Sequence, residues 1–246
     1  MSAVKPKRYL LLQIRDDAAV CAEEYQCFLQ HSGLAAENLD VFNIYKHTDF
    51  GIEILDGYAG LLVGGASEAN VLQPELYSFI EPAVKLMRHC ADIGFPVFAS
   101  CFGFQLAVLA LGGEISNCVQ YRETGTVAVD LSKAAATDPL YKAMPDPLIV
   151  VSVHQQSATD LPDGCELMAS TAACLHSFRV KNKPFWAFQF HPEVNLQTLI
   201  ERLSRYQEKY TSNSARLDEV LAAAVDTPEA NTLLAIFIGY VEQQFS

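Results

Sequence analysis

One cysteine, Cys101, lies where a short apolar segment meets a helix-forming segment, within residues 96–113. A strand that turns directly into a helix exposes the side chain at the junction, at the carboxyl edge of a sheet. Ala99 and Gly103 flank Cys101 two residues away on either side, and small residues suit a bend in which backbone crowds backbone. The helix N-terminus that follows favours a thiolate and can hold an oxyanion. This pattern predicts a nucleophile elbow with Cys101 as the nucleophile.

A thiol nucleophile needs an imidazole nearby that is oriented by a third group, and the best candidates are His191 and Glu193. They follow another apolar segment, and Pro192 between them restricts its own backbone and favours an extended His191. Both side chains can therefore project from one rigid corner. His191 would take the proton of Cys101 and later protonate the leaving amine, and Glu193 would orient the imidazole ring.

The Cys101 elbow and the His191–Glu193 corner together resemble the class I glutamine amidotransferase family, in particular stand-alone domains of the GMP-synthase-like type. The family elbow is Gly-x-Cys-x-Gly-x-Gln, and this chain departs from it only at Ala99. A third similarity is the apolar segment ending at Gly64 and Gly65, where the family has its oxyanion loop. The resemblance covers about residues 8–205. It implies that the backbone N–H groups of Gly65 and Phe102 bind the oxyanion, although Gly64 and Gly65 could be only a tight turn.

The same resemblance implies substrate-binding residues outside the triad. Gln105 stands where the family contacts the amino-acid end of its substrate, and Gly64 borders the oxyanion loop. The segment 121–126 resembles a family Glu-x-Gly stretch, but it could also be a solvated turn before a strand. Gln156 stands where the family often has Asp, which leaves recognition of the acceptor open. The implied substrate contacts are Gly64, Gln105, Glu123, Gly125, Thr126 and His154.

The resemblance implies cleavage of a γ-glutamyl amide through a thioester on Cys101, and two substrate classes remain open. With glutamine, the reaction is the glutaminase step of an amidotransferase, and ammonia would pass to a separate synthase subunit because no acceptor-activating segment is evident. With a γ-glutamyl peptide or γ-glutamyl amine, no partner is needed. A non-catalytic module is a third alternative, disfavoured because the cysteine, the histidine and the glycine turn are all present.

Composition restricts the class of protein and its partners. Half of the 246 residues are apolar, 19% are charged and the formal net charge is −12, which disfavours nucleic acid and anionic membranes as partners. The seven cysteines are irregularly spaced without a C-x-x-C pair, which argues against a disulfide framework and a zinc site, so we expect no cofactor. No leader-like or membrane-length apolar segment is evident, and a cytoplasmic protein is expected. The other cysteines are expected to be small core residues: Cys21, Cys27, Cys90, Cys118, Cys165 and Cys174. Surface or packing roles are expected for His31, His47, His89 and His176.

Apolar segments alternate with amphipathic ones, which predicts an α/β fold. We expect a flavodoxin-like, open and mostly parallel sheet with helices on both faces, an added antiparallel region and a C-terminal helical extension. Residues 1–205 would form the catalytic domain, and 206–246 would form helices packed on it, with a homodimer interface as the alternative. Expected strands are 9–14, 39–44, 60–63, 96–100, 126–131, 148–153, 166–170, 174–180 and 186–190. Expected helices are 18–31, 74–93, 102–111 and 196–210, with two more near the C-terminus.

Overall fold

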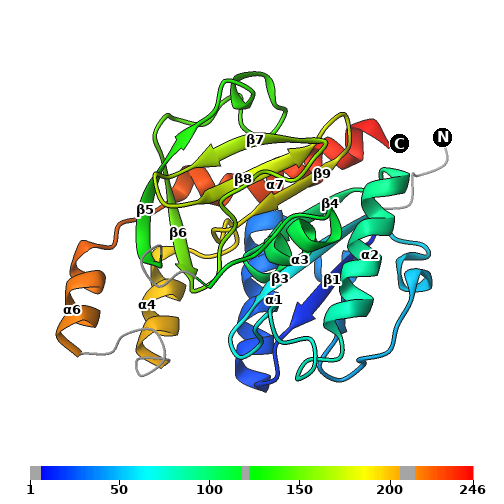
Figure 1. The fold of residues 1–246 in the computed structure, drawn as a ribbon, viewed down its shortest axis with the longest axis horizontal. Coiled ribbons are helices and arrows are strands. Elements are labelled where there is room, and N and C mark those ends of the chain that lie inside the picture. Colours follow the sequence, from blue (N-terminus) through cyan, green and yellow to red (C-terminus); the bar gives the residue numbers. More distant parts are fainter. Residues whose placement is uncertain (1–6, 118–121, 206–213, 246) are drawn as a thin grey trace.

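A computed structural model describes residues 7–117, 122–205 and 214–245 and contains one nine-stranded sheet (Figure 1). The first half of the sheet is parallel, as expected for strands that are buried on both faces. Its strands lie in the order β2 (Leu39–Asn43), β1 (Tyr9–Ile14), β3 (Gly60–Ala66), β4 (Val97–Ser100) and β9 (Phe185–Phe188).

The second half of the sheet is antiparallel and continues from β9. Its strands lie in the order β8 (Leu175–Val180), β7 (Cys165–Ser170), β5 (Glu123–Leu131) and β6 (Leu148–His154). β5 and β6 are long partners, and their register sets Glu123 directly opposite His154. This half is the antiparallel region that the sequence predicts.

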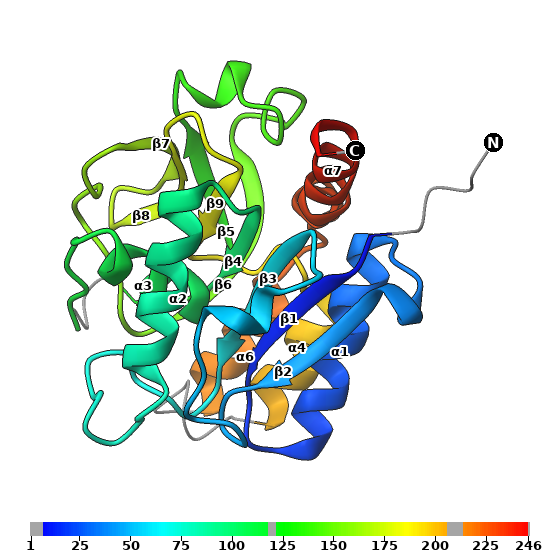
Figure 2. The ribbon, with the colours of Figure 1, turned by 90° about the vertical axis from the view of Figure 1, so that its right-hand side faces the viewer.

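Helices cover both faces of the sheet, as Figures 1 and 2 show. α2 (Ile80–Ile93) and α3 (Phe102–Ala110) share one apolar cluster with alternate residues of β1, β3 and β4. α1 (Ala18–Ser32) and α7 (Pro228–Gln244) share the cluster on the opposite face. The Asp17 carboxylate caps the start of α1 by accepting from two backbone N–H groups, and Gly33 ends the helix with a left-handed φ of 70°.

The C-terminal segment packs on the same sheet. In α7 the apolar stripe is fully buried against the strands, with Leu233, Leu234, Phe237 and Val241 at 0% exposure. α4 (Leu196–Arg205) and α6 (Ser214–Ala223) form a third, smaller cluster with β6. The predicted α/β class, with its parallel core, antiparallel region and C-terminal helices, is confirmed. Residues 206–213 and 246 of the predicted 206–246 extension lie outside the described residues.

Several predicted boundaries differ from the structure: β3 runs to Ala66 instead of ending at residue 63, and β5 begins at Glu123 instead of residue 126. The helix expected from Pro74 begins at Ile80, because residues 70–79 form turns: the Asn70 side chain accepts from Leu72 N–H, and the Gln73 carbonyl accepts from two later N–H groups. The last strand ends at Phe188, two residues earlier than expected. Short 3-10 helices lie at Ala36–Asn38, Ile52–Leu55 and Ala135–Thr137.

Within the described residues, no single helix is long and apolar enough to cross a membrane. Residues Leu217–Ala223 and Pro228–Gln244 reach that length only as a pair, and the pair bends by 74°.

Candidate active site

Cys101 is the single residue between β4 and α3, and it forms the sharp bend that joins them. Its backbone has φ 52° and ψ −100°, a strained conformation for a residue other than glycine. Its N–H donates to the Phe188 carbonyl at 2.7 Å, which ties the bend to β9. A Cβ on Gly103 would lie 3.0 Å from the Val63 side chain and carbonyl, so the close approach of α3 to β3 requires glycine. The strain and the close packing are those of a nucleophile elbow.

His191 and Glu193 stand together on the loop that follows β9. The Glu193 carboxylate accepts from His191 Nδ1 at 2.7 Å, and both side chains are buried. The His191 N–H donates to the Val151 carbonyl on β6 at 2.8 Å. From the other side, the Asn231 amide of α7 donates to the carbonyls of Pro192 and Val194 at 2.8 and 2.9 Å. Strand β6 and helix α7 thus fix the corner that carries the imidazole.

The charges of the site are coupled through His191. Burial lowers the pKa of this imidazole, but the Cys101 thiolate and the Glu193 carboxylate, with their hydrogen bonds, outweigh it and raise the pKa to about 9. Burial likewise opposes ionisation of Glu193, yet the nearby His191 charge keeps its pKa below the ordinary value. The arrangement therefore favours an imidazolium beside the Glu193 carboxylate.

A buried ion pair supports the glycine turn at the end of β3. The Arg15 guanidinium donates to the Glu24 carboxylate at 2.9 Å, and both side chains are at most 4% exposed. A Cβ on Gly64 would lie 2.7 Å from this carboxylate, and a Cβ on Gly65 would lie 3.0 Å from both Arg15 Nη2 and His191 Cε1. The Gly65 position is also 3.6 Å from Cys101 Cβ. Only glycines fit between the ion pair and the catalytic cluster.

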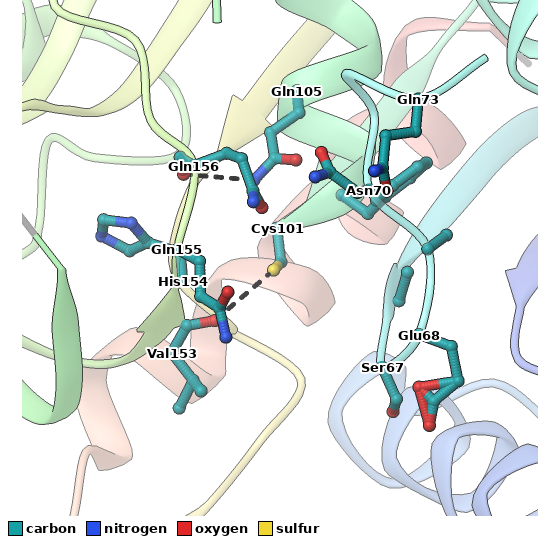
Figure 3. Close-up of a pocket in the computed structure, with 13 residues that line it drawn as sticks. Ser67, Glu68, Asn70, Gln73, Cys101, Gln105, Val153, His154, Gln155 and Gln156 are labelled. Atoms are coloured by element: carbon teal, nitrogen blue, oxygen red, sulfur yellow. Dashed lines mark hydrogen bonds between the residues drawn. The ribbon is translucent and has the colours of Figure 1, made fainter. Parts of the chain in front are cut away.

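A cavity of about 220 Å³ opens above Cys101 (Figure 3). Two loops form its walls, residues 66–73 after β3 and residues 153–156 at the end of β6. Gln105 lies in the wall, and its side-chain amide donates to the Gln156 carbonyl at 3.2 Å. Among the lining residues that the structure describes, none is Lys or Arg, and Glu68 is the one carboxylate. The cavity is polar, small and open to the nucleophile.

His191 lies in a second, smaller cavity of about 30 Å³ next to the first. Ala66, Ser67 and Val153 line both cavities. Cys101 lines the first cavity, and its thiol contacts the Val153 carbonyl at 3.8 Å. Cys101 and His191 thus line two adjacent cavities that share part of their walls.

The structure does not bring all predicted substrate residues to the cavity. Glu123, Gly125 and Thr126 do not belong to the lining that the structure describes. The Thr126 hydroxyl accepts from the Val225 N–H, and a Cβ on Gly125 would meet the Val220 side chain of α6. His154 lines the cavity, but its ring turns away from Cys101 (Figure 3), toward Glu123.

Glu123 is the centre of a second polar cluster that the sequence did not indicate. Its Oε2 atom accepts from Nε2 of His154 at 3.1 Å and of His176 at 2.6 Å, and its Oε1 accepts from the Thr171 hydroxyl. Cys174 Sγ lies 4.0 Å from Oε2. Burial opposes the charge of Glu123, but the two histidines hold its pKa well below the ordinary value. His176, expected to have a packing or surface role, is fully buried and paired with this carboxylate.

The remaining cysteines are free thiols in the described chain, and Cys118 lies outside it. Burial raises the pKa of Cys27 to about 11 and of Cys90 and Cys165 to about 12. Burial and the Glu123 charge raise that of Cys174 to about 12. These thiols are poor nucleophiles near neutral pH.

Comparison with known proteins agrees with this geometry. GMP synthase (glutamine-hydrolysing) of Caldicellulosiruptor saccharolyticus is 35% identical over 104 residues, 42% of this chain and 20% of that protein. The enzyme of the same name from Lactobacillus delbrueckii subsp. bulgaricus is 29% identical over 168 residues, 65% of this chain and 32% of that protein. The chain thus matches about a third or less of the length of these relatives.

Two solved structures share the fold. A glutamine amidotransferase from Thermotoga maritima superposes with a TM-score of 0.74 at 18% identity, covering 96% of this chain and 97% of that one. A glutamine amidotransferase from Methylobacillus flagellatus superposes with a TM-score of 0.67 at 19% identity, covering 95% and 94%. The family model for glutamine amidotransferase class-I matches residues 30–205. The chain belongs to the class I glutamine amidotransferase family.

Proposed function

We propose that this enzyme hydrolyses the side-chain amide of glutamine through a γ-glutamyl thioester on Cys101. The observation that carries the proposal is the connected cluster of Cys101, His191 and Glu193, in which Cys101 lines a polar cavity. A strained cysteine at a helix N-terminus, next to an imidazole oriented by a carboxylate, is the arrangement that nucleophilic acyl transfer requires.

In the proposed mechanism, the Cys101 thiolate attacks the δ-carbonyl carbon, and the carbonyl electrons move onto oxygen. The N–H groups of Gly65 and Phe102 stabilise this oxyanion, since Phe102 is the first residue of α3 and its N–H has no partner within the helix. His191 gives its proton to the departing ammonia as the C–N bond breaks. It then takes a proton from water, and the hydroxide attacks the thioester to release glutamate and restore the thiolate.

The cavity suits the amino-acid end of a γ-glutamyl group. The Glu68 carboxylate complements an α-ammonium, and the side-chain amides of Asn70, Gln73 and Gln105 offer neutral donors for an α-carboxylate. We propose these roles together with those predicted for Gln105 and Gly64. The substrate roles of His154, Glu123, Gly125 and Thr126 stay predictions.

We further propose that the ammonia is used by a separate synthase subunit. The similarity to the glutamine-hydrolysing GMP synthases covers at most about a third of their length, and the class I glutamine amidotransferase family matches residues 30–205 of this chain. A cytoplasmic location and a homodimer stay predictions from the sequence.

A γ-glutamyl peptide or γ-glutamyl amine hydrolase is the second candidate. It is favoured by the neutral Gln155 and Gln156 in the cavity wall, since Gln156 replaces the Asp that is common in the resembled family. A neutral Gln156 in place of the charged Asp changes which substrate groups can bind next to the scissile bond.

The two candidates are separated by steady-state kinetics on the purified chain. Release of ammonia from glutamine is compared with release of amine from γ-glutamyl amides and peptides, with Cys101→Ala as the blank. A higher kcat/KM for glutamine, increased by an added synthase, supports the amidotransferase. A higher kcat/KM for a γ-glutamyl amide or peptide supports the hydrolase, and no turnover of any substrate contradicts both.

A further inference from the structure

The cluster around Glu123 gathers donor atoms from three strands of the antiparallel half. Glu123 begins β5, His154 ends β6 directly across from it, Cys174 precedes β8 and His176 lies within β8. One ligand atom from each residue lies within 4.8 Å of all the others. These residues are 31, 20 and 2 positions apart along the chain, so only the fold brings them together.

Three of these side chains approach the same oxygen of the fourth, Glu123 Oε2, instead of forming a chain. Glu123 Oε2 is contacted by His154 Nε2 at 3.1 Å, by His176 Nε2 at 2.6 Å and by Cys174 Sγ at 4.0 Å. Cys174 Sγ is also 3.9 Å from His154 Nε2. The side chains of His154 and His176 are fully buried, and that of Glu123 is 15% exposed. A buried set of two imidazoles, a thiol and a carboxylate is a typical ligand set for a transition metal.

We infer that Glu123, His154, Cys174 and His176 form a binding site for a divalent transition metal, with zinc as the expected ion. Zinc prefers nitrogen and sulfur ligands in tetrahedral geometry, at bonds of about 2.0–2.3 Å. At tetrahedral angles such bonds separate neighbouring ligand atoms by about 3.3–3.5 Å. The 3.1 Å between Glu123 Oε2 and His154 Nε2 is close to this value, whereas the 2.6 Å between Glu123 Oε2 and His176 Nε2 must increase. Cys174 Sγ lies 3.9 Å from His154 Nε2 and 4.0 Å from Glu123 Oε2, and it must move about half an ångström closer to both.

Binding of the zinc ion releases one proton. Cys174 would release its thiol proton to solvent as the zinc–sulfur bond forms, and each histidine would bind through the lone pair of Nε2. The protons of the imidazoles then sit on Nδ1. The Nδ1 atom of His176 is buried and lacks a hydrogen-bond partner among the described residues, and the ring of His154 also hydrogen-bonds to the backbone of Gln156. Two neutral histidines, a thiolate and a carboxylate leave the zinc ion without net charge.

The site would act as a structural clamp on the wall of the cavity. Four protein ligands leave no open position for substrate, which is the arrangement of structural zinc. The ligand His154 is followed by Gln155 and Gln156 in the cavity wall and preceded by Val153, whose carbonyl contacts the Cys101 thiol. A metal joining β5, β6 and β8 would fix this wall relative to the nucleophile.

The test uses the tag-free chain and two metals. Purified protein is stripped with a chelator, loaded with zinc, dialysed and analysed by mass spectrometry, and we expect about one zinc per chain. Loaded instead with cobalt, it should show the sulfur-to-metal charge-transfer band and the visible bands of a tetrahedral site. This inference does not depend on the proposed function, because neither readout involves turnover.

Variants separate this site from the other cysteines. Cys174→Ser should lose the charge-transfer band and His176→Gln the stoichiometric zinc, whereas Cys101→Ala and the buried control Cys165→Ser should keep both. A band retained in Cys174→Ser would overturn the assignment. Circular dichroism verifies that the variants fold. If they do not fold, the unmodified chain still tests the inference: without stoichiometric zinc and without a cobalt band, the four residues form a hydrogen-bonded cluster that binds no metal.

Discussion

Two clusters in this molecule use cysteine, histidine and glutamate, and they arrange these residues in opposite ways. In the parallel half, Cys101, His191 and Glu193 form a line in which each group contacts the next. In the antiparallel half, the histidines and Cys174 all approach one oxygen of Glu123. In the linear cluster, one ring nitrogen of His191 contacts the Glu193 carboxylate and the other faces the Cys101 thiol. In the convergent cluster, the rings of His154 and His176 both contact the Glu123 carboxylate.

The difference teaches that residue type alone does not decide the chemistry. A linear arrangement with a strained nucleophile at one end can pass a proton along its length. A convergent arrangement of buried donors concentrates ligands on a point and offers a place for a cation.

The largest expected effect is that of Cys101→Ala, which should lower kcat on the order of 10⁴-fold because no other group can form the thioester. Cys101 should also be the thiol that reacts first with a γ-glutamyl electrophile, since burial raises the pKa of Cys27, Cys90, Cys165 and Cys174. Cys165→Ser is the matched control and should keep its activity. Retained turnover in Cys101→Ala would show that the linear cluster is not the catalytic one.

His191→Asn should lower kcat on the order of 10³-fold, and Glu193→Gln on the order of 10²-fold. The reason is that His191 exchanges the protons, whereas Glu193 orients the ring and stabilises its charge. Steady-state ammonia release measures both. Equal losses would give Glu193 a primary role, and an active His191→Asn would contradict the triad.

Gly65→Ala should lower kcat on the order of 10-fold to 100-fold, because the new methyl group would lie 3.0 Å from His191 Cε1 and Arg15 Nη2 and displace them. Gly239→Ala in α7 is the control: its Cβ meets nothing within 4 Å, and alanine favours a helix. Activity of both variants is measured beside thermal unfolding. Equal activity in the two would mean that the glycine turn does not constrain the site.

The pH dependence of the acylation rate should report the pKa of His191. Since its pKa is raised to about 9, the imidazolium persists through neutral pH, and acylation should decline as the pH rises through about 9. Glu193→Gln removes a charge that raises this pKa, so the alkaline limb should move to lower pH. An unmoved limb would mean that another group controls it.

The smallest expected effect is that of Asn231→Ala, which removes the donors to the Pro192 and Val194 carbonyls and should lower kcat several-fold. Thr232→Ala is the neighbouring control, since its hydroxyl donates to the Glu229 carbonyl within α7. Comparing kcat at matched stability separates positioning of His191 from general loosening. A similar loss in both variants would indicate that α7 acts only through its core packing.

The parts of the molecule that the sequence predicted are those carried by short segments. Cys101, His191 and Glu193 each lie in a local pattern of apolar strand and turn residues, and the fold follows from the alternation of such patterns. The helix predicted from Pro74 failed for the opposite reason. Side-chain and backbone turns at Asn70 and Gln73 outweigh the helical periodicity there and form the cavity wall instead.

The Glu123 cluster was beyond the reach of local patterns. Its members meet because of the β5–β6 register and the placement of β8, and neither can be deduced from spacing along the chain. The resemblance implies a substrate role for Glu123, and the sequence alone predicts a core position for Cys174 and a surface or packing role for His176. A buried histidine whose partner is a distant carboxylate leaves no periodic signal in the sequence.

The hydrogen bonds from Asn231 in α7 to the loop that carries His191 have a consequence for synthesis on the ribosome. Cys101, His191 and Glu193 all leave the ribosome before Asn231 does. Until Pro228–Gln244 has emerged, the carbonyls of Pro192 and Val194 lack their amide donors, and one face of the sheet lacks its cover. We therefore expect the His191 corner of the nascent chain to become fixed only after synthesis has passed this helix.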